Sequence, residues 1–190
     1  MVPTEELEGF KPRSLVPKLA IAIAVAAVVI VALLPARDQD APHFDLPLLS
    51  GRGRLSTEEL SGSPVVLNFF ASWCLPCREE APRFEAAYRK YRDEGVRFVG
   101  VNVQDRTETA RRFVKEFGVT FPVVVDAERE LAEQLEVYGL PQTFFIDETG
   151  ALAAVKKGED VGRGSGTATF GALSASQLEA GIEALLARTR

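Results

Sequence analysis

Residues 65–77 read VVLNFFASWCLPC, and this stretch decides the fold. Its first seven residues, 65–71, are nearly all apolar, which is typical of a strand buried on both faces. From Cys74 onward the pattern becomes helical, because three aromatic residues recur at i, i+4 and i+7 between Phe84 and Tyr91 while charges occupy the other face. A buried strand therefore leads directly into a helix that begins at the pair of cysteines.

Cys74 and Cys77 are three residues apart at the predicted helix start, so both sulfurs lie on one face, close enough to bond. The unpaired N–H groups of the first turn favour a thiolate, and such positions lower a thiol pKa from about 8.5 to about 3.5–7.5. We expect Cys74 to attack and Cys77, the more buried sulfur, to resolve the mixed disulfide. A structural staple is the alternative, but closing so short a loop stabilises a fold by only about 2 kcal/mol.

Composition excludes several other classes of function. The 190 residues, 46% of them hydrophobic, suffice for one domain and a short appendage. The net charge of -5 argues against nucleic acid as a partner. Two cysteines and the single His43 supply too few ligands for a zinc site, which needs about four. We therefore expect neither a metal nor a cofactor, and we interpret His43 as polar surface.

The rest of the chain alternates between strands and helices. We predict a hairpin over 44–55 and a helical turn capped by Ser56 and Glu59. Strands are expected at 96–103, 123–125, 142–147 and 151–155, and helices at 107–117, at 128–135 and from Ser174. The glycine-rich stretch 156–169 is predicted to be a mobile loop. The sum is an α/β fold with a mixed central sheet flanked by helices.

Residues 19–34 are apolar without interruption and follow three basic residues. At 1.5 Å per residue this run spans about 24 Å, slightly less than the bilayer core of about 30 Å. A cleaved signal peptide is the alternative. We favour a single transmembrane anchor over 19–36, a cytoplasmic tail over 1–18, a linker over 37–43 and an extracytoplasmic domain over 44–190. Outside the cytosol a disulfide can persist.

Two further stretches carry a family resemblance. Residues 69–82, FFASWCLPCREEAP, resemble the active-site stretch of the thioredoxin superfamily, and residues 138–147, YGLPQTFFID, resemble its cis-proline strand. Together with residues 41–70 they resemble the membrane-anchored TlpA-like, or ResA-like, thioredoxin family, which includes cytochrome c biogenesis thioredoxins. The resemblance implies a thioredoxin-like fold and thiol-disulfide oxidoreductase activity.

The resemblance also implies roles for residues around the cysteines. The bond Leu140–Pro141 should be cis and lie against the disulfide, where its backbone can pair with a substrate chain. Trp73 should be an exposed aromatic that contacts partners, although packing in the core is its alternative. Pro82 should kink the helix, and Pro76 lies between the cysteines without being diagnostic of a subfamily.

Asn68 occupies the position at which cytosolic thioredoxins carry a buried acid that helps the second cysteine lose its proton. That base is therefore missing, a change that TlpA-like proteins share. Glu80, one helical turn beyond Cys77, matches an acidic residue that several family members place near the cysteines. If Glu80 is buried, its pKa should rise and it could relay a proton. A solvated carboxylate, as we expect for Glu79, is the alternative.

By resemblance, we expect a reductant on the outer face of the cytoplasmic membrane, with apocytochrome c as the leading substrate class. A membrane dithiol donor would supply its electrons, and the domain should be a monomer. Three alternatives stay open: a broader disulfide reductase or oxidant for exported proteins, a redox-inert assembly chaperone, and a peroxidase. The peroxidase is disfavoured because its cysteine context lacks the CxxC pair and the preceding Trp73.

Overall fold

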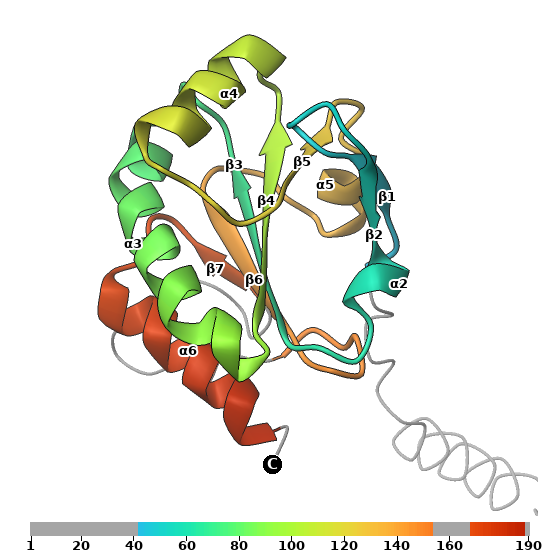
Figure 1. Ribbon diagram of the computed structural model, residues 1–190, viewed down its shortest axis with the longest axis vertical. Helices are drawn as coiled ribbons and strands as arrows, with labels where there is room; N and C mark the ends of the chain where they lie inside the picture. The colour runs from blue at the N-terminus through green and yellow to red at the C-terminus, as the bar shows by residue number, and fades with distance from the viewer. Residues whose placement is uncertain (1–41, 154–167, 189–190) are drawn as a thin grey trace, which may run out of the picture. The chain divides into compact units, whose positions relative to one another are not determined.

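The computed structural model describes residues 42–153 and 168–188, which form a five-stranded sheet with helices on both faces (Figure 1). The sheet order is β5-β4-β3-β6-β7, and β1 and β2 form a separate hairpin. The strands are β1 (Asp45–Pro47), β2 (Arg54–Ser56), β3 (Val65–Phe70), β4 (Arg97–Val103), β5 (Val123–Asp126), β6 (Gln142–Ile146) and β7 (Ala168–Phe170). The helices are α2 (Thr57–Leu60), α3 (Leu75–Tyr91), η1 (Arg92–Glu94), α4 (Thr107–Glu116), α5 (Glu130–Gln134) and α6 (Ala175–Arg188).

Strand β3 lies at the centre of the sheet, and all six of its residues are buried. It pairs in parallel with β4 and antiparallel with β6, while β4 pairs in parallel with β5 and β6 antiparallel with β7. A strand covered on both faces is expected to be almost entirely apolar, and Asn68 is the one polar residue of β3. The mixed sheet and the thioredoxin-like α/β fold are confirmed.

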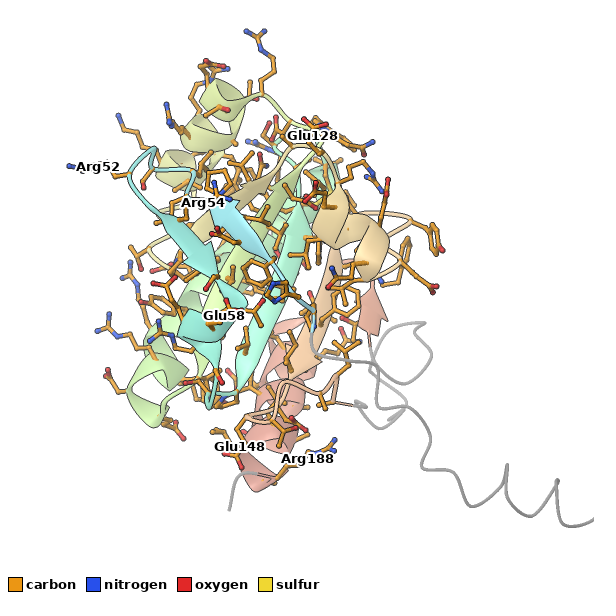
Figure 2. The ribbon with its side chains drawn as sticks, turned by 90° about the vertical axis from the view of Figure 1, so that its right-hand side faces the viewer. Arg52, Arg54, Glu58, Glu128, Glu148 and Arg188 are labelled. Atoms are coloured by element: carbon orange, nitrogen blue, oxygen red, sulfur yellow. A yellow bond between two sulfur atoms is a disulfide. The ribbon has the colours of Figure 1, made fainter. Side chains whose placement is uncertain are left out.

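Different elements cover the two faces of the sheet. Helices α3, α4 and α6 pack on one face, and the hairpin, α2 and α5 pack on the other (Figure 1). Side chains of β3 alternate between the two cores, so that Asn68 shares its face with Val66 and Phe70, under α3. Figure 2 shows the hairpin side, where Arg52 is exposed and the guanidinium of Arg54 binds Asp45 on the other hairpin strand.

Most element boundaries agree with the sequence, and both predicted caps are present. The backbone N–H of Ser56 donates to Glu59, and that of Ser174 donates to Gln177. The predicted strand 151–155 is described only as far as residue 153, where Leu152 forms an isolated antiparallel bridge to Ile146 and the N–H of Ala153 donates to Phe145, so these residues pair with β6 without forming a longer strand. The predicted loop 156–169 is wrong at its end, because residues 168–170 form β7, the edge strand.

Several predictions concern residues outside the described ranges. These are the tail 1–18, the anchor 19–36, most of the linker 37–43 and residues 154–167. Within 42–153 and 168–188 no helix has the length and apolar content needed to cross a bilayer.

Candidate active site

The two cysteines form a disulfide at the first turn of α3. Cys74 is the N-cap residue, and its sulfur accepts a hydrogen bond from the backbone N–H of Cys77 at 3.2 Å. Such a contact with a helix N-terminus stabilises negative charge on sulfur. Cys74 is 4% exposed and Cys77 1%, so Cys77 is the more buried residue, as predicted. The geometry suits Cys74 as the attacking sulfur.

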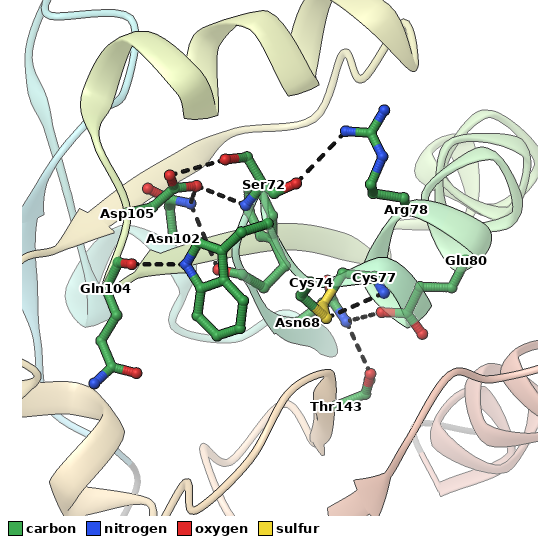
Figure 3. Close-up of a disulfide and its surroundings, with 12 residues drawn as sticks. Asn68, Ser72, Cys74, Cys77, Arg78, Glu80, Asn102, Gln104, Asp105 and Thr143 are labelled. Carbon is green, nitrogen blue, oxygen red and sulfur yellow. Dashed lines mark hydrogen bonds between the residues drawn. A yellow bond between two sulfur atoms is a disulfide. The ribbon is translucent and has the colours of Figure 1, made fainter.

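A buried polar cluster lies beside Cys77 (Figure 3). Asn68 faces α3 from the centre of β3, and its side-chain amide donates to Glu80 at 2.9 Å and to the hydroxyl of Thr143 at 3.1 Å. Thr143 is the direct neighbour of Asn68 across the β3–β6 pair, which places both side chains on one face. Asn68 and Cys77 also line the same small cavity. The acid therefore lies close to the resolving cysteine.

Glu80 is 1% exposed, so the solvated alternative is wrong for it, whereas Glu79 is exposed. Burial raises the pKa of Glu80 to about 7, although hydrogen bonds from Asn68 and Leu173 and the charge of Arg83 pull that pKa down. Its second carboxylate oxygen accepts from the backbone N–H of Leu173 at 3.1 Å. A carboxyl group with this pKa can both take up and release a proton near neutral pH.

Trp73 is 61% exposed, so packing in the core is wrong for this residue. Its indole N–H donates to the carbonyl oxygen of Gln104 at 2.8 Å (Figure 3). The preceding residue, Ser72, is bound through its backbone N–H and its hydroxyl by Asp105. The loop that follows β4 thus holds the loop that follows β3.

The Leu140–Pro141 peptide bond is cis, as the resemblance implies. Pro141 directly precedes β6, and its carbonyl oxygen accepts from the N–H of Gly171. Among the described residues, neither the N–H nor the carbonyl of Leu140 has a hydrogen-bond partner. A free donor and a free acceptor on one residue can pair with an extended chain.

Large apolar side chains are exposed on the segments around the disulfide. Trp73 and Leu75 flank Cys74 in the sequence, and Tyr138 precedes the cis-proline segment. Phe170 is paired with the residue after Pro141, and its ring lies against Gly139. Exposed apolar groups gathered at one place mark interaction surfaces. We call these four side chains the apolar rim: Trp73, Leu75, Tyr138 and Phe170.

The structure brings together most of the residues that the sequence singled out. Pro76 lies in the first turn of α3, where a missing N–H costs nothing, and Pro82 lies inside that helix. Pro82 has no backbone N–H to donate to the preceding turn. His43 lies on the exposed surface beside Glu58. Within the described ranges no group of three or more potential metal ligands lies together.

Sequence reasoning missed the residues that hold the site from other elements. Ser72 and Asp105 both follow parallel strands, β3 and β4, and the carboxyl ends of such strands meet at one edge. That rule could have predicted their contact. Thr143 needed the register of β6, and Leu173 needed the course of the chain after β7. Neither has a local signal.

Residues 38–155 match the AhpC/TSA family. The chain is 38% identical over 119 residues to the thiol-disulfide oxidoreductase ResA of Bacillus subtilis, an alignment that covers 63% of this chain and 66% of that protein. It is 37% identical over 128 residues to the ResA of Geobacillus kaustophilus, with 65% of this chain and 72% of that one covered. The chain thus spans about two thirds of the length of these relatives.

Solved structures show the same similarity. A thiol:disulfide interchange protein of the thioredoxin family from Chlorobium tepidum superposes with a TM-score of 0.66 at 27% identity, which covers 80% of this chain and 98% of that one. StoA from Bacillus subtilis superposes with a TM-score of 0.58 at 26% identity, with 75% and 97% covered.

Proposed function

The chain belongs to the AhpC/TSA family and is a thiol-disulfide oxidoreductase of the ResA type, and from this premise we propose that it is a membrane-anchored extracytoplasmic reductant of apocytochrome c. The observation that carries the proposal is the disulfide at the start of α3 with a buried acid beside it. Each step of the exchange can be assigned to a residue of this site.

In the reduced enzyme the Cys74 thiolate attacks a sulfur of the substrate disulfide, and the other substrate sulfur leaves as a thiolate. Cys77 then loses its proton and attacks the sulfur of Cys74 in the mixed disulfide. The second substrate sulfur leaves, so that the substrate gains two electrons and the enzyme is left with the Cys74–Cys77 disulfide. Both departing thiolates take up protons. A membrane dithiol donor would restore the enzyme by the same exchange.

Glu80 is the proposed proton acceptor for Cys77. It lies one helical turn further along α3 and is linked through Asn68 to the cavity that Cys77 lines. Its pKa of about 7, raised by burial, matches a group that exchanges protons near neutral pH. Asn68 supplies the hydrogen bond that keeps the carboxylate in place.

The same acid supports the reducing direction. Strong oxidants such as DsbA stabilise their thiolate, which favours the reduced form, and potentials in this fold span about 150 mV. Here a buried carboxylate next to Cys77 opposes a second negative charge on sulfur. A thiolate on Cys77 is therefore less stabilised than it would be without this acid, which favours the disulfide form. We expect a potential on the thioredoxin side of that range.

The apolar rim and the free backbone groups of Leu140 would receive an extended substrate segment that carries apolar residues near its cysteines. The proposed location rests on the apolar run 19–34 and the basic residues before it. There the enzyme would meet cysteine pairs of exported proteins, including those that bind haem in apocytochrome c.

Trapping in the source cells tests the proposal. Cys77→Ser cannot resolve the mixed disulfide, so whatever Cys74 attacks stays attached and can be identified by mass spectrometry. Apocytochrome c or a cytochrome-maturation protein on Cys74 would support the proposal. A broad set of exported proteins would instead show a general reductase or oxidant, and full activity with both cysteines changed to serine would show a redox-inert chaperone.

A further inference from the structure

The turn between β4 and α4 holds the residues that precede the disulfide. Asp105 accepts hydrogen bonds from the backbone N–H of Ser72 at 2.6 Å and from its hydroxyl at 2.8 Å. Asn102 and Thr109 donate to the same carboxylate, at 3.1 Å and 2.6 Å. One side chain thereby ties the chain two residues before Cys74 to the beginning of α4, and Figure 3 shows its bonds to Ser72 and Asn102.

The neighbouring residue holds the aromatic side chain. Gln104 has a φ of 49°, in the left-handed region that side chains other than glycine rarely adopt. In this conformation its carbonyl oxygen accepts from the Trp73 indole. The Gln104 side chain forms no hydrogen bond within the described ranges. The backbone shape of the turn, rather than the glutamine itself, therefore matters, and such a shape persists only when its surroundings hold it.

We propose that Asp105 is a positioning residue for disulfide exchange, because it fixes Ser72 directly and the Trp73 indole through the turn that it anchors. Trp73 needs this support, since a side chain that is 61% exposed has few packing contacts to orient it. A groove of about 510 Å³ lies beside the Trp73 side chain, and Asp105 and Thr109 are among the other residues that line it. A substrate that meets a fixed indole loses less conformational freedom on binding.

The inference rests on the proposed exchange chemistry of Cys74. Kinetics with a large and a small disulfide substrate separate the positioning role of Asp105 from that chemistry. Asp105→Asn is nearly isosteric. Its amide NH2 group cannot accept a hydrogen bond, however, and must face at least one of the groups that now donate to the carboxylate. We expect the KM for a disulfide-bonded CxxCH peptide to rise about tenfold, which is about 1.4 kcal/mol of binding. The rate with hydroxyethyl disulfide, which is too small to need the Trp73 indole, should fall by a much smaller factor.

Fluorescence gives a readout that a general loss of stability would not produce. Trp73 is the single tryptophan of the chain, so its anisotropy decay reports this side chain alone. Asp105→Asn should add a fast local rotation that the wild type lacks. Asp147→Asn is the matched control, because the carboxylate of Asp147 also accepts from a threonine hydroxyl and from backbone N–H groups, but it follows the end of β6 opposite to Pro141. It should change neither KM nor anisotropy.

An unchanged KM and anisotropy in Asp105→Asn would overturn the inference, as would equal changes in Asp147→Asn. If Asp105→Asn does not fold, Ser72→Ala removes one of the two bonds and should shift both readouts less but in the same direction. A folded Ser72→Ala enzyme with wild-type values would overturn the inference too. A wild-type enzyme that is inactive with both disulfides would instead overturn the proposed function.

Discussion

Replacing Glu80 by Gln should make the stability of the folded protein less dependent on pH. The pKa of Glu80 is about 7 in the fold because of burial, against an ordinary value of 4.5. The native protein therefore keeps a proton between pH 4.5 and 7 that the unfolded chain releases. Stability must then fall as pH rises through this window, by at most about 1.4 kcal/mol per pH unit. Over the whole shift the loss is about 3 kcal/mol.

Glutamine has nearly the same shape but cannot ionise, so Glu80→Gln should escape that loss. Urea unfolding of the oxidised protein at several pH values measures the effect as the difference in unfolding free energy between variant and wild type. We expect this difference to grow in favour of the variant by about 3 kcal/mol between pH 4.5 and pH 8. Glu79→Gln, on the exposed side of the same helix, should not reproduce the trend.

The same variant tests the proton relay. In the wild type, the rate of disulfide reduction should change near pH 7 as Glu80 gains or loses its proton. In Glu80→Gln this inflection should disappear, while Glu79→Gln should retain it. If the stability difference were flat across the pH range, the raised pKa would be refuted. If the rate profile kept its inflection, Glu80 would not be the relay.

Three other changes have defined outcomes. Partial burial raises the pKa of Glu85, but hydrogen bonds from Thr120 and Arg89 outweigh it and lower that pKa, so its stabilisation is lost as pH falls. Glu85→Gln should therefore cost about 1–3 kcal/mol in urea unfolding at pH 7 and less at pH 3, the opposite trend to Glu80→Gln. Gly181→Ala should destabilise the fold by about 1–3 kcal/mol in the same assay, because the added Cβ would collide with a buried phenylalanine ring. This cost should exceed the gain from the better helix propensity of alanine. A variant more stable than the wild type would show that the ring can move. Asn68→Ala should move the inflection of the rate above pH 7, because it removes a hydrogen bond that lowers the pKa of Glu80, and an unmoved inflection would contradict the role of the amide.

The centre of the fold could be predicted because its signals are local. A continuous apolar run identified β3, the change to helical spacing placed the cysteines at the start of α3, and the resemblance supplied the cis bond before Pro141. The exposure of Trp73 followed from the same resemblance, whereas the resemblance leaves open whether Glu80 is buried or solvated. These residues lie within short stretches whose patterns do not depend on distant parts of the chain.

The edges of the fold and the supports of the site depend on contacts between distant segments. Strand β7 has only three residues and follows a glycine-rich stretch, so it lacks a periodic pattern. Its pairing with β6 is what makes it a strand. The bond from Leu173 to Glu80 and the bonds from Ser72 to Asp105 likewise require the assembled sheet. A polar residue after a strand carries no local signal of its partner.

The division of labour between the two cysteines is the central claim, and a mixed disulfide formed in vitro tests it most directly. Reduced Cys77→Ser protein is mixed with an excess of a disulfide-bonded CxxCH peptide and analysed by intact mass spectrometry. We predict a stable one-to-one adduct through Cys74, and none with Cys74→Ser under the same conditions. Accumulation of the adduct in Cys74→Ser, or turnover by Cys77→Ser at the wild-type rate, would contradict the assignment.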